Sequence, residues 1–159
     1  MRIGVLGAGN VGGTLGRRWA ELGHDVAFGV RHPEGGAAAV KGGQGLPARA
    51  RVATPAEAVR GAEAVVLTTP WAAVPETLRE AGADRGALDG LPLLDATNAI
   101  KAGFAVDLGP NGESAGERVQ ALVPNAHVVK VFNTTGFDNM RDPAYDGAPT
   151  VMFYAGDDA

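Results

Sequence analysis

Cysteine is absent from this chain of 159 residues, and histidine occurs only three times. The lack of thiols excludes a disulfide framework, thiol catalysis and thiolate metal sites, although it does not identify the compartment. No Ser-His-Asp arrangement, pair of catalytic carboxylates or histidine-rich metal motif is apparent in the sequence. We therefore expect no metal site.

Long apolar runs and an excess of positive charge are also lacking. No segment approaches the ~20 apolar residues of a membrane-spanning helix. The formal net charge of -4 argues against nucleic acid as the main partner, because phosphate backbones select basic surfaces. Since the first expected strand begins at Ile3, we expect no signal or transit peptide. These features predict a cytoplasmic, soluble protein without membrane insertion, built around one substantial core.

The first 13 residues, MRIGVLGAGNVGG, join a short apolar run to a glycine-rich turn. Gly7 permits the tight turn, Gly9 lets the backbone approach phosphates, and Gly12 lets the next helix lie against the strand. The first helical amides, from Asn10 and Val11 onward, lack intrahelical partners and can bind an anion. This order predicts a site for the pyrophosphate of a dinucleotide. The alternative is a tight strand-to-helix turn without a ligand.

The helix after this turn has apolar residues at helical spacing, namely Val11, Leu15, Trp19 and Leu22. We expect this stripe to face the sheet, with Trp19 in the core rather than stacked on a ligand. The charged residues between them, Arg17, Arg18 and Glu21, are then expected to face water. Gly23 is expected to end the helix.

Apolar segments separated by helix signals continue along the chain. Further strands are expected at residues 25–30, 49–53, 62–69, 91–95, 127–132 and 150–155. Capping boxes at residues 54–57 and 114–117 predict two helix starts, and a further helix is expected from about residue 75 to 81. The alternation predicts an α/β fold, a doubly wound, mostly parallel Rossmann-type sheet with helices on both faces. Residues 1–159 are expected to form a single domain that is cut short, because residues 157–159 would open another helix.

Polar residues follow the expected strands, where ligands of open parallel sheets bind. They form four clusters, Arg31-His32, Thr68-Thr69-Pro70-Trp71, Asp95-Ala96-Thr97-Asn98 and Asn133-Thr134-Thr135. Turn chemistry could explain any one cluster, but all four beside the glycine-rich loop predict a cleft. His24 precedes the second expected strand and His127 begins the sixth, so both are expected at the opposite edge.

The end of the second strand indicates which dinucleotide binds. An NAD site requires a carboxylate there, but the nearest acid, Asp25, begins the strand about 16 Å away, at ~3.3 Å per residue. Arg31 stands at the tip instead, and a guanidinium suits a 2′-phosphate. We therefore favour NADP over NAD. Arg31 could also simply be solvated at a strand end, and His32 could be either a second donor or a solvated turn residue.

No catalytic side chain is expected at this edge. Asp95 is the only carboxylate near it, and that residue could equally cap the following turn. Hydride transfer between two redox cofactors requires alignment and exclusion of water, with no obligatory general acid. The absence of an acid or base therefore fits hydride transfer by positioning.

Several of these segments together resemble the NADPH-dependent reductases of the deazaflavin coenzyme F-420. They are Ile3–Gly12, Gly29–Arg31, Val74 after Pro70-Trp71, Asp95–Asn98, Lys130–Asn133 and Phe153–Asp157. The resemblance extends in order over essentially the whole chain. The same domain type also occurs in the cytoplasmic part of the six-transmembrane ferric reductases.

The resemblance implies roles for individual residues. Gly7, Gly9, Asn10 and Val11 would hold the pyrophosphate, and Arg31 would hold the 2′-phosphate. The resemblance further implies that Thr69, Pro70 and Trp71 border the nicotinamide and that Asn98 and Asn133 line the redox cleft. Members of the family continue into C-terminal helices that help to build the deazaflavin site and a dimer contact, so a homodimer is possible where that part is present.

Three functional hypotheses follow. The first is an oxidoreductase that passes hydride between NADP(H) and a small-molecule acceptor of the deazaflavin, coenzyme F-420-like, or flavin type. The second is a non-catalytic NADP-binding sensor or partner module. The third, a reductase of a small carbonyl or imine, requires a proton donor near the nicotinamide, for which only water or Thr69 is available.

Overall fold

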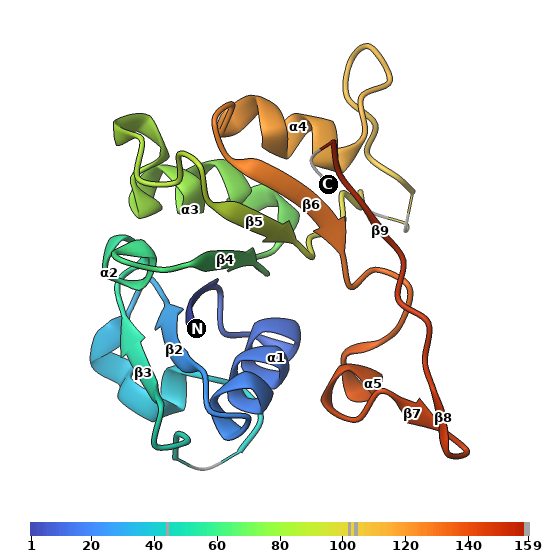
Figure 1. Ribbon diagram of the computed structural model, residues 1–159. Helices are drawn as coiled ribbons and strands as arrows, with labels where there is room; N and C mark the ends of the chain where they lie inside the picture. The colour runs from blue at the N-terminus through green and yellow to red at the C-terminus, as the bar shows by residue number, and fades with distance from the viewer. Residues whose placement is uncertain (44, 102, 104, 158–159) are drawn as a thin grey trace.

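A computed structural model of the chain describes residues 1–43, 45–101, 103 and 105–157. Its strands are β1 (Arg2–Leu6), β2 (Asp25–Gly29), β3 (Ala50–Ala53), β4 (Ala64–Leu67), β5 (Pro92–Asp95), β6 (His127–Val131), β7 (Ala144–Tyr145), β8 (Ala148–Pro149) and β9 (Tyr154–Ala155). Seven of these strands form one sheet in the order β3-β2-β1-β4-β5-β6-β9, while β7 and β8 form a separate hairpin. The first six strands in this order, β3, β2, β1, β4, β5 and β6, are parallel, and β9 is antiparallel to β6 (Figure 1).

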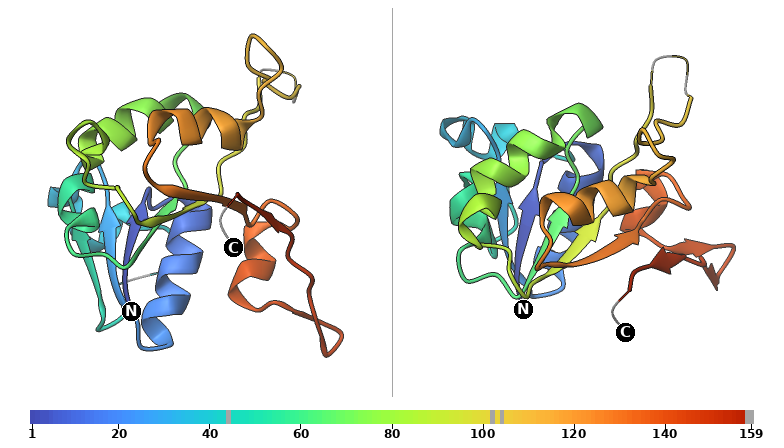
Figure 2. Two further views of the ribbon diagram at one scale, coloured as in Figure 1. Left: turned by 45° about the horizontal axis from the view of Figure 1, so that its top comes forward. Right: turned by 90° about the horizontal axis from the view of Figure 1, so that it is seen from above.

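Helices cover both faces of this sheet (Figure 2). They are α1 (Asn10–Glu21), α2 (Pro55–Val59), α3 (Val74–Ala81), α4 (Ala115–Leu122) and α5 (Phe137–Arg141), with short 3-10 turns η1 (Pro33–Ala39), η2 (Trp71–Ala73) and η3 (Ala83–Arg85). The predicted doubly wound α/β fold is therefore confirmed.

Two apolar cores lie on opposite faces of the sheet because successive strand residues point in opposite directions. On one face, Leu67 of β4 packs with residues of α2, α3 and α4, including Leu78 and Val119. On the other face, Val66 packs with Ala20 of α1 and with residues of β1 and β2. The central strands β1 and β4 are buried on both faces, which explains their continuous apolar sequences.

Helix α1 lies closer to the sheet than its large apolar residues predict. Its buried residues are Gly12, Gly13, Leu15, Gly16, Arg17 and Ala20. A Cβ on Gly16 would lie 2.4 Å from the ring of Phe28, so the fully buried Phe28 fills the space that a side chain would take. Small residues therefore form much of the contact face.

This contact corrects two expectations about α1. Arg17, expected to face water, is only 9% exposed. Leu22, expected to face the sheet, is 58% exposed because it lies at the C-cap, beyond the last helical residue. Trp19 is half-buried against the core and lies 6.1 Å from the ring of Phe132, as its predicted core role requires. Gly23 has a φ of 94° directly after the C-cap, so the predicted end of the helix is confirmed.

Both predicted capping boxes are present. Thr54 and Glu57 cap α2, and Ser114 and Glu117 cap α4, each with reciprocal bonds between side chain and backbone amide. Helix α3 begins one residue before Pro75, as expected for a proline in a first turn. Within the described residues, no helix has both the length and the apolar character required to span a membrane.

The chain after β6 differs from the prediction. A strand was expected over residues 150–155, but only β9 pairs there, with Lys130 and Val131 of β6. Val151 and Phe153 are each 71% exposed. Helix α5 and the β7–β8 hairpin, which the sequence did not indicate, precede this strand. The expected helix start at residues 157–159 falls partly on Asp158 and Ala159, outside the described residues.

Candidate functional site

The loop between β1 and α1 has the close backbone contacts that its glycines predict. Gly7 has a φ of 98°, a conformation that favours glycine, and its amide donates to the Gly29 carbonyl at 3.0 Å. A Cβ on Gly12 would lie 2.2 Å from the Gly7 carbonyl oxygen, so a larger residue would push α1 away from the loop. Beyond the adjoining backbone, no atom of the described residues lies within 4 Å of the Cβ position of Gly9, so the loop is open to a ligand there.

The first turn of α1 presents backbone amides that no side chain caps. Gly9 is the N-cap, and the first turn contains no acidic residue. Asn10 is exposed and Val11 is half-buried at this end of the helix. Uncapped amides at a helix N-terminus attract anions. The residues present therefore fit the predicted pyrophosphate, and their binding role stays a prediction.

Two threonines after β4 lie against the same loop. The Thr68 hydroxyl is within hydrogen-bond distance of the Leu6 and Gly7 carbonyl oxygens, at 3.1 and 3.0 Å, and so ties β4 to the loop. The Thr69 hydroxyl oxygen is buried and has no hydrogen-bond partner within the described part of the chain. Because buried hydroxyls are normally hydrogen-bonded, Thr69 is available to a ligand. Pro70 follows as an exposed residue and precedes η2.

The two side chains predicted to bind the 2′-phosphate, Arg31 and His32, both contact carboxylates. Arg31 forms an ion pair of 3.0 Å with Glu76 of α3, and both side chains are about half exposed. His32 lies 3.0 Å from the carboxylate of Glu34. The pKa of the Glu34 carboxyl is lowered, first by a hydrogen bond from the backbone amide of Glu34 and then by the contact with His32. Both contacts are exposed and would exchange readily with a bound phosphate.

Trp71 interacts with the connection between β5 and α4. Its indole NH donates to Asp107 at 3.2 Å, and the Arg118 guanidinium lies 4.7 Å from the ring centroid. The pKa of Asp107 is lowered, first by a hydrogen bond from Lys101 and then by those from Trp71 and Arg118. The sequence analysis did not indicate this anchoring of Trp71, because the partners lie more than 30 residues away.

The residues after β5, which we call the 95–98 loop, are held by buried polar side chains. Asp95 is fully buried and accepts hydrogen bonds from the amide and hydroxyl of Thr97, at 2.8 and 2.7 Å. Asp95 therefore caps this turn, one of the two roles the sequence left open. The Asn133 side chain donates to the Asn98 side-chain oxygen at 2.9 Å and to the Thr97 carbonyl at 3.2 Å. The structure thus brings Asn98 and Asn133 together.

Lys130 of β6 completes this network and was not singled out as a site residue from the sequence. Its ammonium lies 3.3 Å from the buried Asp95 carboxylate and donates to the carbonyls of Asp95 and Thr97. Burial lowers the pKa of Lys130, while the Asp95 carboxylate opposes that shift. The residue after β6, Phe132, has a φ of 68°, which is unusual for a bulky side chain and directs the chain toward Asn133.

A second loop lies against the glycine-rich loop on the β2 side; we call it the 40–45 loop, of which the structure describes residues 40–43 and 45. The Lys41 amide donates to the Ala8 carbonyl at 2.9 Å. The buried Arg17 guanidinium donates to four carbonyls of this segment, those of Val40, Lys41, Gly43 and Gly45, at distances between 2.7 and 3.3 Å. The sequence analysis assigned no role to this segment; its glycines at 42, 43 and 45 are a possible sequence signal for accessible carbonyls, but nothing local indicates the arginine that binds them.

The structure therefore places the predicted site residues at the ends of β1, β2, β4, β5 and β6, along the carboxyl edge of the sheet. His24 lies at the opposite edge, where it contacts the amino terminus of Met1 at 3.3 Å, and His127 begins β6. Among the described residues, no group of acidic or histidine side chains is arranged to hold a metal ion. This edge can cradle a phosphate-bearing ligand and position it against the 95–98 loop.

Comparison with known proteins gives a family match for the part of the chain that builds this edge. The family model described as NADP oxidoreductase, coenzyme F420-dependent, matches residues 2–99, from β1 through the 95–98 loop. None of the curated proteins matches the chain.

Solved structures show the same fold over the whole chain. A candidate F420-dependent NADP reductase from Arthrobacter sp. FB24 is 36% identical, with a TM-score of 0.83, over 100% of this chain and 74% of that one. A hypothetical protein from Sinorhizobium meliloti, SMa0349, is 26% identical, with a TM-score of 0.80, over 99% and 74% of the two chains. A reductive aminase from Aspergillus terreus, solved with NADPH and ethyl-5-oxohexanoate, is 19% identical, with a TM-score of 0.65, over 96% and 46%, and shares the fold alone.

Proposed function

The chain belongs to the family of coenzyme F420-dependent NADP oxidoreductases, and on this basis we propose that it transfers hydride between NADP(H) and a deazaflavin or flavin-type acceptor. NADP-dependent oxidoreductase activity is the class that the family match and the Arthrobacter relative support. The observation that carries the proposal is the open, uncapped glycine-rich loop beside the end of β2. We further propose that residues 1–159 act as one NADP-binding domain.

The adenosine half of the cofactor is proposed to bind between the ends of β1 and β2. Its pyrophosphate would rest on Gly7, Gly9 and Gly12 and accept hydrogen bonds from the amides near Asn10 and Val11. Arg31 would leave Glu76 and bind the 2′-phosphate, with His32 as a second donor. An exposed ion pair contributes only about 0–1 kcal/mol, so this exchange of partners costs little.

The nicotinamide half is proposed to lie toward the ends of β4, β5 and β6. The Thr69 hydroxyl, which lacks a protein partner among the described residues, would bind the cofactor there, with Pro70 and Trp71 at the border. The linked side chains of Asn98 and Asn133 would line the position of the acceptor. Bound NADPH supplies a hydride, and the reduced acceptor takes its proton from water. The protein thus contributes alignment and exclusion of competing water.

The proposal is tested by mixing the protein with NADPH and an oxidised deazaflavin. We expect acceptor absorbance to bleach in step with the loss of NADPH. A flavin assayed in parallel distinguishes the two acceptor types. Unchanged spectra with both acceptors, at protein concentrations that bind NADPH, would contradict the proposed hydride transfer.

The role of Arg31 is tested separately by the ratio of NADPH to NADH affinity. Arg31→Glu should lower this ratio strongly, and Glu76→Gln should raise it, because Arg31 then loses its competing carboxylate. Arg79→Glu is the matched control, since Arg79 also lies near Glu76 but on α3 itself. An unchanged ratio in Arg31→Glu, measured by fluorescence titration, would show that another residue selects the 2′-phosphate.

A non-catalytic NADP-binding module is the alternative. It is favoured by the engagement of Asp95 with Thr97 and Lys130, which leaves this carboxylate unsuited to proton transfer. The alternative predicts tight NADPH binding without turnover for every acceptor tried. Steady turnover with a deazaflavin or a flavin excludes it.

A further inference from the structure

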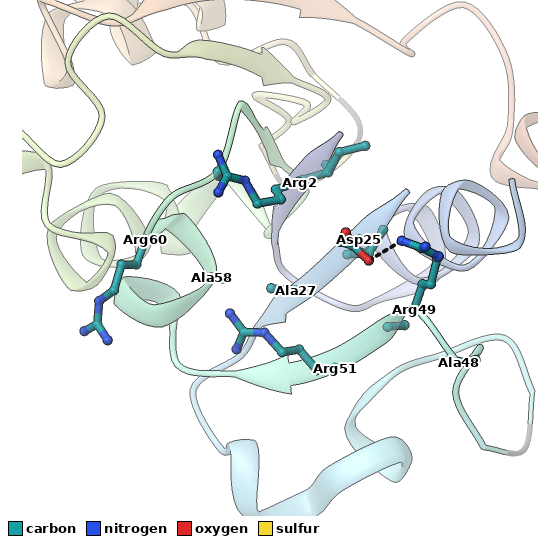
Figure 3. Close-up of a pocket in the computed structure, with 12 residues that line it drawn as sticks. Arg2, Asp25, Ala27, Ala48, Arg49, Arg51, Ala58 and Arg60 are labelled. Atoms are coloured by element: carbon teal, nitrogen blue, oxygen red, sulfur yellow. Dashed lines mark hydrogen bonds and ion pairs between the residues drawn. The ribbon is translucent and has the colours of Figure 1, made fainter. Parts of the chain in front are cut away.

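A hollow of about 450 Å³ lies at the opposite, amino-terminal edge of the sheet. It is lined by the first residues of β1, β2 and β3 and by the end of α2. Figure 3 shows Arg2 and Arg51 on opposite sides of this hollow, with Ala27 and Ala58 between them. The volume falls in the range of about 300–1,000 Å³ that is usual for small-molecule sites. We call it the basic hollow.

The lining of the basic hollow carries more positive than negative charge. Four of its residues are arginines, and Asp25 is its one carboxylate. Asp25 is paired with Arg49 at 2.7 Å, and Arg2 is paired more loosely, at 3.7 Å, with Glu63 outside the lining. Within the described part of the chain, Arg51 and Arg60 form no ion pair. Two guanidinium groups of the lining thus lack a carboxylate in direct contact among the described residues, on a chain whose formal net charge is -4.

Glu57 forms no ion pair with Arg51 or Arg60 within the described residues, although their charges lower its pKa, after the larger effect of hydrogen bonds from Thr54. Its oxygen accepts hydrogen bonds from the amide and hydroxyl of Thr54 at the start of α2. Arg51 instead donates to the backbone carbonyl of Glu57 at 3.1 Å, which fixes its guanidinium near α2. Arg51 is therefore already held in place, with further N–H groups available to a ligand.

The floor of the hollow consists of small side chains. Ala27, Ala50 and Ala58 contribute to it, and they leave room that larger residues would fill. Helix α2 is set tightly above the sheet, because a Cβ on Gly4 would lie 2.7 Å from the Ala58 carbonyl oxygen. A rigid apolar floor below fixed cationic groups suits a ligand with a flat apolar part and an anionic head.

We propose that the basic hollow binds a small phosphate monoester, whose phosphate contacts Arg51 and Arg2 and whose apolar part lies on the alanine floor. Arg51 forms no ion pair among the described residues, and the pair of Arg2 with Glu63 is exposed and long at 3.7 Å, so both guanidinium groups can turn to a ligand. A doubly charged phosphate matches these two groups better than a singly charged carboxylate does. This site lies at the opposite edge of the sheet from the glycine-rich loop, so it is independent of the proposed cofactor site.

The test is calorimetric titration of the whole chain at fixed ionic strength, with phenyl phosphate as the probe. We expect saturable binding that is about tenfold weaker in Arg51→Gln, because one charge-assisted contact is lost. Arg60→Gln should weaken binding less, since Arg60 lies at the outer end of α2. Arg141→Gln on α5 is the matched control, with the same loss of charge far from the hollow, and should leave affinity unchanged.

Two further titrations distinguish binding in the basic hollow from binding at the carboxyl edge. Benzoate should bind more weakly than phenyl phosphate, and saturating NADP should not change the affinity for phenyl phosphate. Competition with NADP would place the probe at the carboxyl edge and overturn the proposal. Equal losses in Arg51→Gln and Arg141→Gln, or no saturable binding, would overturn it as well. Should Arg51→Gln fail to fold, Arg2→Gln compared with Arg141→Gln decides the question.

Discussion

The 40–45 loop and the 95–98 loop both lie at the carboxyl edge, and both are held by a buried charged side chain, but in different ways. Arg17 binds the first loop through four backbone carbonyls and has no carboxylate partner within the described residues. Asp95 binds the second loop through Thr97 and is itself paired with Lys130. One loop therefore depends on carbonyl dipoles around a cation, and the other on a compensated ion pair.

This difference determines what each loop loses when its anchor is removed. The carbonyls around Arg17 belong to exposed residues except for Val40, so water can replace most of the lost donors. Removing Asp95 leaves the ammonium of Lys130 largely buried without its counter-charge. An unpaired buried charge is more costly than a solvated carbonyl. The comparison therefore predicts an order of effects.

Asp95→Ala should have the largest effect. We expect a loss of about 3–5 kcal/mol in the free energy of unfolding, because the variant breaks a buried pair and leaves the Thr97 amide without its acceptor. Urea denaturation measures this loss. Asp84→Ala, an exposed aspartate paired only with Arg85 at 3.5 Å, is the control and should change stability by less than about 0.5 kcal/mol. Equal changes in the two variants would remove the distinction between the loops.

Arg17→Met should have the second largest effect, a loss of about 2 kcal/mol from several charge-assisted hydrogen bonds that water partly replaces. The affinity for NADPH should fall as well, because the freed 40–45 loop contacts the glycine-rich loop through Lys41 and Ala8. Arg18→Met, one residue along on the exposed side of α1, should be close to neutral. If Arg17→Met lowers the stability but leaves the affinity for NADPH unchanged, Arg17 stabilises the fold without supporting the cofactor site.

Alkaline pH should change the stability that the Asp95–Lys130 pair contributes, without mutation of Asp95 or Arg17. The pKa of Lys130 is lowered in the folded protein from 10.5, chiefly by burial. The folded state therefore releases this proton at a lower pH than the unfolded chain does, and the free energy of unfolding should rise toward pH 10.5. We expect the stability of the wild type relative to Lys130→Arg to increase with pH; a flat or falling difference would contradict the shift.

The smallest effect is expected at the two capping boxes, where both halves of the sheet should respond alike. Hydrogen bonds from the Thr54 and Ser114 amides lower the pKa of Glu57 and of Glu117. The ionised carboxylates of Glu57 and Glu117 therefore stabilise the folded state above about pH 4.5, and this contribution is lost as the pH falls through their folded pKa values. Glu57→Gln and Glu117→Gln should therefore differ from the wild type near pH 7 and converge with it in acid. Divergent acid profiles would show that the two halves differ in their helices as well as in their loops.

Features that depend on neighbouring residues in the sequence were predictable. The buried strands, the end of α1 at Gly23 and both capping boxes follow from short patterns, and the structure contains each of them. The fold class follows in turn, because alternating strands and helices allow few arrangements. The polar residues at the carboxyl edge were found for the same reason.

Arg17 shows why the rest could not be predicted. Its position on α1 suggested solvent, because the large apolar residues mark a different stripe. Its actual surroundings are set by glycines that bring the helix close to the sheet and by carbonyls more than 20 residues away. The ion pair between Arg31 and Glu76, 45 residues apart, was hidden for the same reason. Such partners depend on tertiary contacts that no local pattern encodes.

Residues 150–155 illustrate a different limit. Their β-branched and aromatic residues predict a strand, but a strand also requires a partner edge. β6 offers only Lys130 and Val131 to β9, so Val151 and Phe153 remain outside the sheet. The propensity of these residues therefore predicted an extended backbone correctly, but it could not predict which of them pair with β6.

The position of β1 has a consequence for synthesis of the chain. β1 is made before both of its neighbours, since Ile3 pairs with Val26 of β2 and with Ala64 of β4. At ~5–20 residues per second, one side of this strand waits on the order of several seconds for its second neighbour to leave the ribosome. Val5 and Leu6, fully buried in the folded protein, are exposed for that time. A chaperone that shields short apolar segments during translation is therefore expected to bind residues 2–6 until β4 has been made.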